Sequence, residues 1–332
     1  MSVPLPSRAD PAEATLLAAA RAGDERAFAQ LTGPYRRELQ VHCYRMVGSL
    51  HDSEDLVQET MLRAWRRLGA FEGRSSLRRW LYRIATNACL NALEREPRVV
   101  LFPTGGEADP PAIARVDWLE PYPDSLLPDP AHADPQARLD LRESLALALL
   151  AAIQHLPPRQ RAMFLLFEVL GWSASEIAEL LETSAAAVNS GLQRARATLG
   201  SGPAPRPTEE EERVLLERFV DAWDRVDIEG LVELLREDAV LAMPPEPVWF
   251  SGAGAVGEFF ATVPGDGDLT RVKLVPTRAN LRPALAAYFD GQAYGIMVFE
   301  LRDGRIAEIV GFADVARSFD RFGLPERLEN LG

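Results

Sequence analysis

The chain has 332 residues, 47% of them hydrophobic, and a net charge of −13. This length predicts two or three domains of roughly 100–150 residues, each with its own core. The sequence has no apolar run near the roughly 20 residues of a membrane-spanning helix, no signal-peptide pattern and no zinc-ligand spacing. We therefore expect a cytoplasmic protein with no membrane, metal or cofactor, and with Cys43 and Cys89 reduced.

The charge is unevenly distributed along the chain. Residues 61–96 contain eight basic and three acidic residues, a balance of +5, whereas residues 209–332 contain 13 basic and 24 acidic residues, a balance of −11. Local charge governs phosphate binding more than the whole-chain balance does. An acidic chain can therefore still contain a nucleic-acid-binding segment.

Composition and periodicity divide the chain into five parts. Residues 13–96 have helical apolar spacing with a break at Gly33-Pro34, residues 97–135 contain nine prolines and predict a linker, and residues 136–200 are helical again. Residues 201–212 predict a second linker. Residues 213–332 predict two helices (213–225 and 228–236) followed by strands, with Asp303-Gly304 as a hairpin turn.

The stretch 51–71 predicts an amphipathic helix, capped by Asp52 or Ser53. Apolar residues from Leu56 to Leu68 share one face. The other face combines polar residues with one leucine, namely Asp55, Gln58, Glu59 and Leu62. Such a face suits docking on a partner, but a solvated surface with one stray leucine has the same pattern.

The stretch "FEGRSSLRRWLYRIATN" (71–87) joins a short polar loop to a second amphipathic helix. Its arginines lie off the apolar stripe of Leu77, Leu81, Ile84 and Ala88. Arginines can hold phosphates, and an aromatic-lined loop can take an unstacked base, so this segment suits single-stranded DNA. An ordinary helix with solvated arginines is the alternative, because the chain uses arginine almost everywhere in place of lysine.

Residues 156–199 predict a helix-turn-helix. Leu156-Pro157-Pro158 begins a helix that ends at Gly171-Trp172-Ser173, and Ser173 with Glu176 has capping-box spacing for the next helix. Thr183 or Ser184 is expected to cap a last helix that contains Arg194 and Arg196. Two short helices in this order are typical of DNA-binding domains.

Together these segments resemble bacterial sigma factors of the extracytoplasmic-function group. The resemblance implies that Asp55, Gln58, Glu59 and Leu62 bind core RNA polymerase. It implies that the promoter −10 element is melted and read by Phe71, Arg74, Ser75, Ser76, Arg78, Arg79, Trp80, Arg83 and Asn87. It also implies that the −35 element is read by Ser184, Ala187, Asn189, Ser190, Gln193, Arg194 and Arg196.

The sequence departs from this family in the last helix. The family pattern Val-Lys-Ser-Arg-Leu is replaced by Val188-Asn189-Ser190-Gly191-Leu192, and the usual turn glycine is missing near Glu182. Two cations are therefore absent, and Gly191 costs roughly 1 kcal/mol of helix stability relative to alanine. We expect fewer phosphate contacts and weaker or differently specified −35 binding.

Residues 213–332 resemble the SnoaL-like cone fold, in which helices and a curved mixed sheet surround a pocket. Aromatic pocket candidates are Trp249, Phe259, Tyr288, Tyr294 and Phe299. This part contains no histidine, since the four are His42, His51, His132 and His155, but it contains the Asp and Tyr residues that some relatives also use for proton transfer. Because the domain follows a sigma factor, regulation is expected in preference to catalysis. The fold class implied is multidomain: two all-α sigma domains, a helical bundle and a helix-turn-helix, plus an α+β cone domain.

The resemblance thus implies a sigma factor with no catalytic residues, whose partners are core RNA polymerase, promoter DNA and a possible small molecule in the last domain. The linker aromatics Trp118, Leu119, Pro121 and Tyr122 are expected to contact the other domains, so that the C-terminal domain tunes activity without a dedicated anti-sigma factor. Two alternatives remain at this point. One is a helix-turn-helix regulator with a ligand-sensing C-terminal domain, and the other is an isomerase or cyclase fused to DNA-binding domains.

Overall fold

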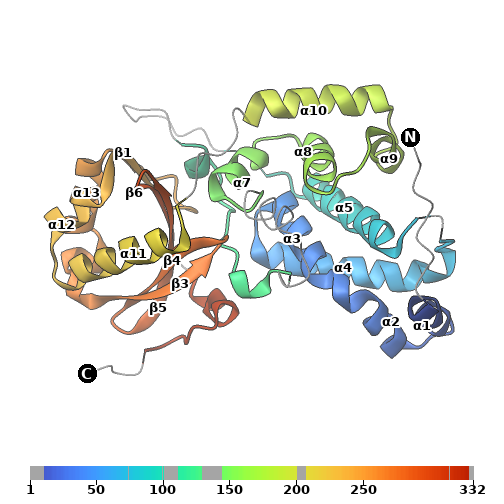
Figure 1. The fold of residues 1–332 in the computed structure, drawn as a ribbon, viewed down its shortest axis with the longest axis horizontal. Helices are drawn as coiled ribbons and strands as arrows, with labels where there is room; N and C mark the ends of the chain where they lie inside the picture. Colours follow the sequence, from blue (N-terminus) through green and yellow to red (C-terminus); the bar gives the residue numbers. More distant parts are fainter. Residues whose placement is uncertain are drawn as a thin grey trace. The chain divides into compact units, whose positions relative to one another are not determined.

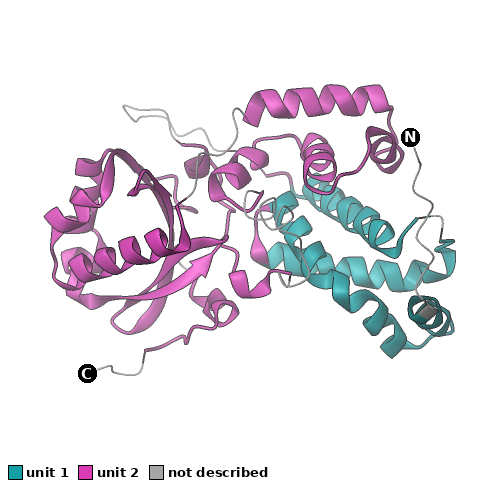
Figure 2. Ribbon diagram, viewed as in Figure 1, with its two compact units in different colours: residues 1–47, 51–96 teal, residues 48–50, 97–332 magenta. Residues whose placement is uncertain are grey.

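The computed structural model describes residues 11–73, 75–98, 100, 111–128, 144–199, 207–313 and 315–328. They form two compact units, coloured separately in Figure 2: residues 1–47 and 51–96, and residues 48–50 and 97–332. In the described part of the chain no helix is both long and apolar enough to cross a membrane. The same residues contain no group of three His, Cys, Asp or Glu side chains that could hold a metal.

The first unit is a helical bundle. Its elements are α1 (Pro11–Arg21), α2 (Glu25–Thr32), the 3-10 turn η1 (Gly33–Tyr35), α3 (Arg36–Val47), α4 (Leu50–Arg67), η2 (Leu68–Ala70) and α5 (Leu77–Arg95). Asp24 and Ser76 cap α2 and α5, because their side-chain oxygens accept hydrogen bonds from first-turn amides. The predicted break at Gly33-Pro34 corresponds to η1.

The second unit begins with the linker and a helical domain. It contains the 3-10 turns η3 (Ala112–Arg115) and η4 (Asp124–Leu126), then α7 (Leu147–Gln154), α8 (Pro158–Phe164), the π-helical turn η6 (Leu165–Val169), α9 (Ala174–Leu180) and α10 (Ala185–Leu199). The predicted capping box is present: Ser173 Oγ accepts from Glu176 N, and the Glu176 carboxylate accepts from Ser173 N. Ser184 Oγ accepts from Ala187 N and so caps α10.

The linker is not the loose tether that its prolines suggested. Ile113, Val116, Leu119 and Tyr122 are each at most 3% exposed, so residues 111–128 contribute to a core. Within this unit the Glu120 carboxylate accepts a hydrogen bond from Leu50 N at 2.6 Å. Helix α4 begins at Leu50. The prediction that Asp52 or Ser53 caps this helix is therefore wrong.

The C-terminal domain packs helices against one mixed sheet (Figure 1). Its helices are α11 (Glu209–Asp224), α12 (Ile228–Glu233) and α13 (Ala253–Thr262), with 3-10 turns η7 (Pro264–Gly267), η8 (Leu269–Arg271) and η9 (Ala316–Phe322). Its strands are β1 (Leu235–Ala242), β2 (Trp249–Ser251), β3 (Val272–Ala279), β4 (Arg282–Phe289), β5 (Gln292–Arg302) and β6 (Arg305–Ala313). The second helix is thus shorter than predicted, since residues 235–236 already belong to β1.

The strand order is β2-β1-β6-β5-β4-β3, and only the β1–β6 pair is parallel. The predicted Asp303-Gly304 hairpin joins β5 to β6, and both residues have the positive φ (53° and 72°) that such a turn requires. Residues from α11, α12, α13 and the inner sheet face form one large apolar core centred on Phe219, Phe260 and Phe299. This core leaves a cavity at one end of the sheet.

Candidate functional sites

The predicted polymerase-docking face lies on α4. Asp55, Gln58 and Leu62 are exposed and Glu59 is partly exposed, whereas the apolar residues of the opposite face are buried except Trp65, which is partly exposed. Leu62 is 49% exposed, which is unusual for a large apolar side chain in this protein. Glu59 pairs with Arg63 at 2.5 Å along the helix surface. The four residues therefore form one surface that the core of the unit does not use.

The segment that follows is held by α1. The Arg21 guanidinium donates hydrogen bonds to the carbonyl oxygens of Leu68 and Phe71, at the start of the loop. The Phe71 side chain is buried, and its ring centroid lies 5.1 Å from that of Trp80. Trp80 is partly exposed and packs on the cluster of Ala20, Ala27 and Leu68. These contacts hold the start of the loop and the first turn of α5 in place.

The residues predicted to read the −10 element divide into two groups. Ser76 and Asn87 are exposed, and Ser75, Arg79, Trp80 and Arg83 are partly exposed. Phe71 is buried, and Arg78 is partly exposed and paired with Glu38. Arg74 lies outside the described residues.

Arg78 joins α5 to α3. Its Nε lies 2.8 and 3.1 Å from the two Glu38 carboxylate oxygens, and its guanidinium lies 4.9 Å from the Tyr82 ring centroid. Beneath this pair, burial and the neighbouring arginines Arg45 and Arg78 lower the pKa of His42 to about 3. A neutral His42 then shares a 2.9 Å hydrogen bond with Thr86. Arg78 therefore ties α5 to α3, while 43% of its side chain stays exposed.

The helix-turn-helix consists of α9 and α10. Val188, Leu192 and Ala195 face its core, and all the predicted −35 residues are exposed: Ser184, Ala187, Asn189, Ser190, Gln193, Arg194 and Arg196. Arg196 is paired with Glu168 of η6 at 2.5 Å and lies over the Phe167 ring. Arg196, one of the two arginines on α10, therefore already makes contacts within its own domain. Fewer cations of α10 remain for phosphate contacts, in addition to the two that the sequence lacks.

Two features of this domain explain its departures from the family pattern. Gly191 is buried against Met163, and a Cβ at this position would lie 2.4 Å from Met163 Sδ, so glycine permits the close approach of α10 to α8. Glu182 has φ of 51° in the turn before α10, a left-handed conformation in which glycine is the usual residue. The turn therefore has its expected shape without its expected residue.

Replacing Glu182 by glycine should stabilise this domain by about 1 kcal/mol, because a left-handed conformation penalises any residue that has a Cβ. Glu182→Ala is the matched control, since it removes the charge but keeps the strain. Hydrogen exchange of the α9 and α10 amides measures the difference. Equal protection in both variants would contradict the explanation.

The linker is hydrogen-bonded to both domains of its unit. Trp118 Nε1 donates to Gln154 Oε1 of α7 at 3.4 Å. Tyr122 is bound at the turn between β3 and β4: its amide donates to Asn280 Oδ1 at 2.9 Å, and its carbonyl accepts from Asn280 N at 2.8 Å. Of the four predicted contact residues, Leu119, Pro121 and Tyr122 are buried and Trp118 is partly exposed.

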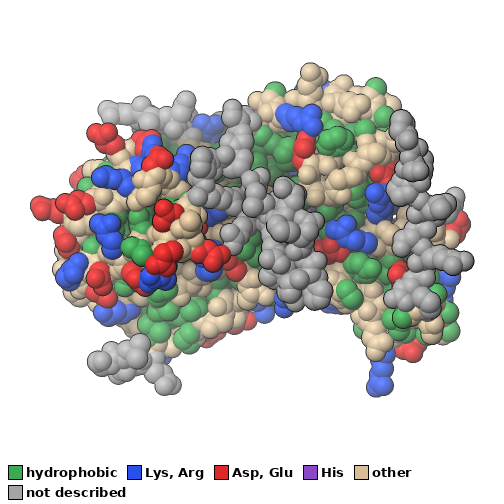
Figure 3. Space-filling view, in the orientation of Figure 1, with side chains coloured by type: hydrophobic (Ala, Val, Ile, Leu, Met, Phe, Trp, Pro, Cys, Tyr) green, Lys and Arg blue, Asp and Glu red, His purple; other side chains and the backbone are tan. Residues whose placement is uncertain are grey.

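The acidic charge of the C-terminal domain is not one continuous field. Figure 3 shows acidic and basic side chains intermixed over its visible face. Arg213, for example, pairs with Glu210 and Glu217 at 2.6 and 2.5 Å on α11. Bulk attraction to a basic block is therefore a weaker explanation for domain contacts than the hydrogen-bonded linker.

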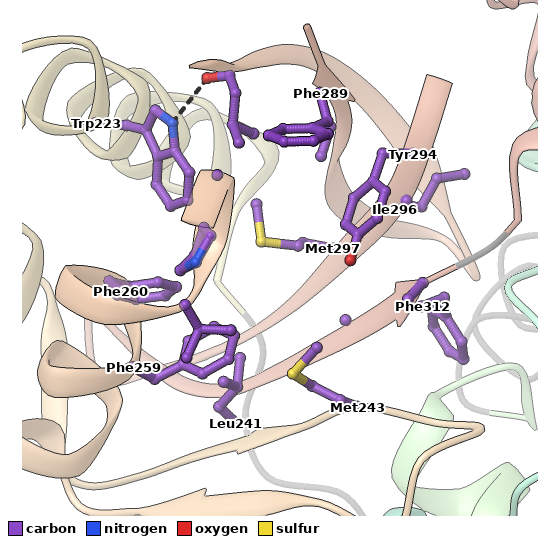
Figure 4. Close-up of a pocket in the computed structure, with 18 of the residues that line it drawn as sticks. Trp223, Leu241, Met243, Phe259, Phe260, Phe289, Tyr294, Ile296, Met297 and Phe312 are labelled. Carbon is purple, nitrogen blue, oxygen red and sulfur yellow. Dashed lines mark hydrogen bonds between the residues drawn. The ribbon is translucent and has the colours of Figure 1, made fainter. Parts of the chain in front are cut away.

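A cavity of about 260 Å³ opens in the C-terminal domain (Figure 4). Rings of Trp223, Phe259, Phe260 and Phe289 and the thioethers of Met243 and Met297 surround it, with Tyr294 at its edge. The Trp223 indole N–H already donates to Val272 O at 3.0 Å. The one charged lining residue, Asp266, is paired with Arg271 at 2.8 Å. The lining therefore offers apolar contact and no unpaired charge.

The aromatic pocket prediction was right for Phe259 and Tyr294 and wrong for Trp249, Tyr288 and Phe299. Successive residues of a strand point to opposite faces of the sheet. Tyr288 lies on the far face, where it packs on Phe319 and donates to Pro325 O at 2.9 Å. Phe299 is fully buried in the core beside Phe219.

The acid of this domain with a raised pKa, Glu308, also lies away from the cavity. Glu308 faces Glu300 across the β5–β6 pair, and burial together with the Glu300 charge raises the pKa of Glu308 to about 7. Glu300 is itself paired with Arg282 at 2.5 Å. Because Glu308 does not line the cavity, it offers no acid or base to a molecule bound there.

Sequence reasoning missed Asn280, Asp124 and Glu120, which make the linker contacts. Each is a common polar residue outside any motif. Only the residue type of Asn280 could have signalled a turn, since asparagine tolerates left-handed backbone.

Three family descriptions match the chain in order. Sigma-70 region 2 matches residues 31–99, Sigma-70, region 4 matches residues 146–199, and SnoaL-like domain matches residues 216–309. These ranges correspond to the helical bundle, the helix-turn-helix domain and the sheet domain described above.

Proteins that are similar to this chain in sequence or structure are also described as sigma factors. The ECF RNA polymerase sigma factor SigG of Mycobacterium tuberculosis is 45% identical over 330 residues, covering 93% of this chain and 86% of the relative. SigW of Bacillus subtilis is 29% identical over 182 residues, covering 53% of this chain and 89% of the relative. The crystal structure of the Mycobacterium tuberculosis sigma factor SigJ shares the fold, with a TM-score of 0.59 and 23% identity over 90% of this chain and 99% of that one. The chain therefore belongs to the ECF RNA polymerase sigma factors, which act in transcription initiation, and it carries a SnoaL-like domain after its two sigma regions.

Proposed function

We propose that this sigma factor binds core RNA polymerase through the exposed face of α4 and reads promoter DNA through two surfaces. The segment 71–91 would engage the opened −10 strand, with Arg79, Trp80, Arg83 and Asn87 at the DNA and with Phe71 and Arg78 supporting them. The exposed face of α10 would read the −35 element. The positions of these residues on solvent-facing helix surfaces support the assignment.

The C-terminal domain would tune these activities through the linker. The observation that carries this proposal is the contact of Tyr122 with Asn280 on one side and of Trp118 with Gln154 on the other. A linker bound to both domains limits how far the helix-turn-helix can move. Because this contact is intramolecular, its effective concentration is near millimolar, and a weak interface suffices. Regulation of this kind needs no dedicated anti-sigma factor.

A chain that ends at residue 206 should gain access to core polymerase and DNA, because the contact that restrains the linker is removed. Run-off transcription and small-angle scattering compare it with the full chain. The full-length variant Trp118→Ala keeps the C-terminal domain and loses one linker contact, so it should show a smaller gain of the same sign. A truncated chain that only loses activity would make the C-terminal domain a required part of the active protein, and the proposal would be wrong.

The cavity of the C-terminal domain would bind a neutral, largely apolar small molecule as a signal. Its size and its aromatic and thioether lining fit such a ligand, and its single carboxylate is paired with Arg271. The one carboxylate of the lining is held by an arginine, and the rest of the lining is mainly apolar and aromatic, so binding rather than chemistry is proposed.

The fluorescent probe 6-propionyl-2-(dimethylamino)naphthalene, which is neutral, should bind this cavity with a blue-shifted emission. Filling the space with Ala287→Phe should abolish the shift, because Ala287 lines the cavity. Val226→Phe, at an exposed position elsewhere in the domain, is the control. An anionic naphthalene sulfonate that binds as well as the neutral probe would contradict the ligand class.

A further inference from the structure

The turn between β3 and β4 has a strained backbone. Its two central residues, Asn280 and Leu281, have φ of 56° and 57°. Asparagine tolerates this conformation, but leucine does not favour it. Such a turn persists only where neighbouring contacts stabilise it. Here those contacts come from the linker.

Asn280 makes contacts to two segments that are far apart in the chain. It is fully buried, at 0% exposure. Its carboxamide oxygen accepts from Tyr122 N at 2.9 Å, and its carboxamide nitrogen donates to Leu145 O at 3.1 Å. Tyr122 belongs to the linker, and Leu145 lies just before α7 of the helix-turn-helix domain. One side chain therefore joins both segments to the sheet.

Asp124 of the linker supports the same turn from the other side. One of its carboxylate oxygens accepts from Leu281 N at 2.8 Å, and the other accepts from Arg278 Nε at 3.2 Å. Pro123 and Ala279 form an antiparallel bridge between these contacts. The linker thus stabilises the strained turn, and the turn in return binds the linker.

We propose that Asn280 is a latch that makes the linker and the segment before α7 separate from the C-terminal domain together. If only one segment left, the carboxamide would lose one partner while it stayed buried, and an unpaired buried polar group is costly. If the linker and the segment before α7 separate together, both the oxygen and the nitrogen of the carboxamide become exposed to water. The inference rests on the proposed regulatory role of the C-terminal domain and names the contact through which it would act.

The test is hydrogen exchange, followed by mass spectrometry, on the full chain with Asn280→Gly. Glycine keeps the positive φ of the turn and removes only the carboxamide. Exchange should become about tenfold faster or more in both residues 122–127 and residues 144–156, because Tyr122 N and Leu145 O lose their partner. Unchanged protection of β5 shows that the domain is still folded.

Two variants serve as controls. Asp303→Gly makes the same kind of change in the β5–β6 turn, whose aspartate pairs with Arg236 and does not touch the linker, so both segments should exchange as in the wild type. Leu281→Gly relieves strain and keeps the amide bonded to Asp124, so exchange should stay the same or slow down. Faster exchange in one segment only, or in neither, would overturn the latch.

The latch and the regulatory role can fail separately in these experiments. If both segments loosen in Asn280→Gly while transcription is unchanged, the latch exists and the regulatory role fails. If truncation at residue 206 activates transcription while Asn280→Gly leaves exchange unchanged, the regulatory role holds and the latch fails.

Discussion

A chain with Asp55→Arg and Glu59→Arg should no longer co-purify with core RNA polymerase, while its circular dichroism stays that of the wild type. Both carboxylates lie on the face of α4 that also exposes Leu62. Reversing two charges at an interface places like charges opposite each other, which costs several kcal/mol, so affinity should fall by at least about 100-fold. The Glu59–Arg63 pair that is lost lies on the surface and contributes only about 0.3–0.5 kcal/mol to folding.

The matched control reverses two exposed acids of α11, Glu217 and Asp221, whose side chains are 62% and 74% exposed. It changes the net charge by the same amount at a surface that the docking proposal does not involve. Polymerase capture should be normal in this control. Normal capture by the α4 variant as well would show that polymerase binds elsewhere.

Local signals in the sequence predicted the helix and hairpin boundaries that depend on a few neighbouring residues. Ser173 and Glu176 form their capping box, and Asp303-Gly304 forms its hairpin turn, because each depends on contacts within four residues. The start of α4 was missed since its cap comes from Glu120, about 70 residues away in the chain. No local pattern at Asp52 could reveal that.

The face of each strand was harder to predict than its existence. Tyr288 was assigned to the pocket, but it lies on the opposite face of the sheet, packed on Phe319. A strand that is buried on both faces has no alternation of polar and apolar residues, and all eight residues of β4 are buried except Phe289, which is partly exposed. The sequence therefore could not specify whether the odd-numbered or the even-numbered residues of the strand face the cavity.

The linker shows where composition misleads. Nine prolines between residues 97 and 135 indicate a segment without its own core, and locally this is correct, because residues 111–128 form only short 3-10 turns. Their burial comes from distant partners, such as Asn280 for Tyr122 and Gln154 for Trp118. Only the aromatic residues within the prolines signalled that this linker packs against something.

Replacing Arg79 by alanine should reduce open-complex formation and make it less sensitive to salt. Arg79 lies at the start of α5, beside the exposed loop and outside the apolar stripe of the helix. Each phosphate contact that is lost on a single strand lowers the slope of log affinity against log salt by about 0.7. Permanganate reactivity of thymines in the melted region, measured over a range of salt on a promoter that the protein transcribes, detects both effects. Arg218→Ala, on the exposed surface of α11, is the control.

Arg78→Ala tests whether neighbouring arginines of the same segment have different roles. Its guanidinium is bound by Glu38, whose side chain is only 21% exposed, so its removal leaves a partly buried carboxylate that keeps the Tyr82 hydroxyl at 3.4 Å but loses its cation. We expect about 1 kcal/mol of destabilisation in the first unit, measured by hydrogen exchange of α3 and α5, and an unchanged salt slope. A changed slope with unchanged stability would show that Arg78 leaves Glu38 to bind DNA.

The Arg79 prediction has its own contradicting outcome. If Arg79→Ala melts promoter DNA as the wild type does at every salt concentration, Arg79 does not contact the opened strand, and the basic charge of residues 61–96 serves another purpose.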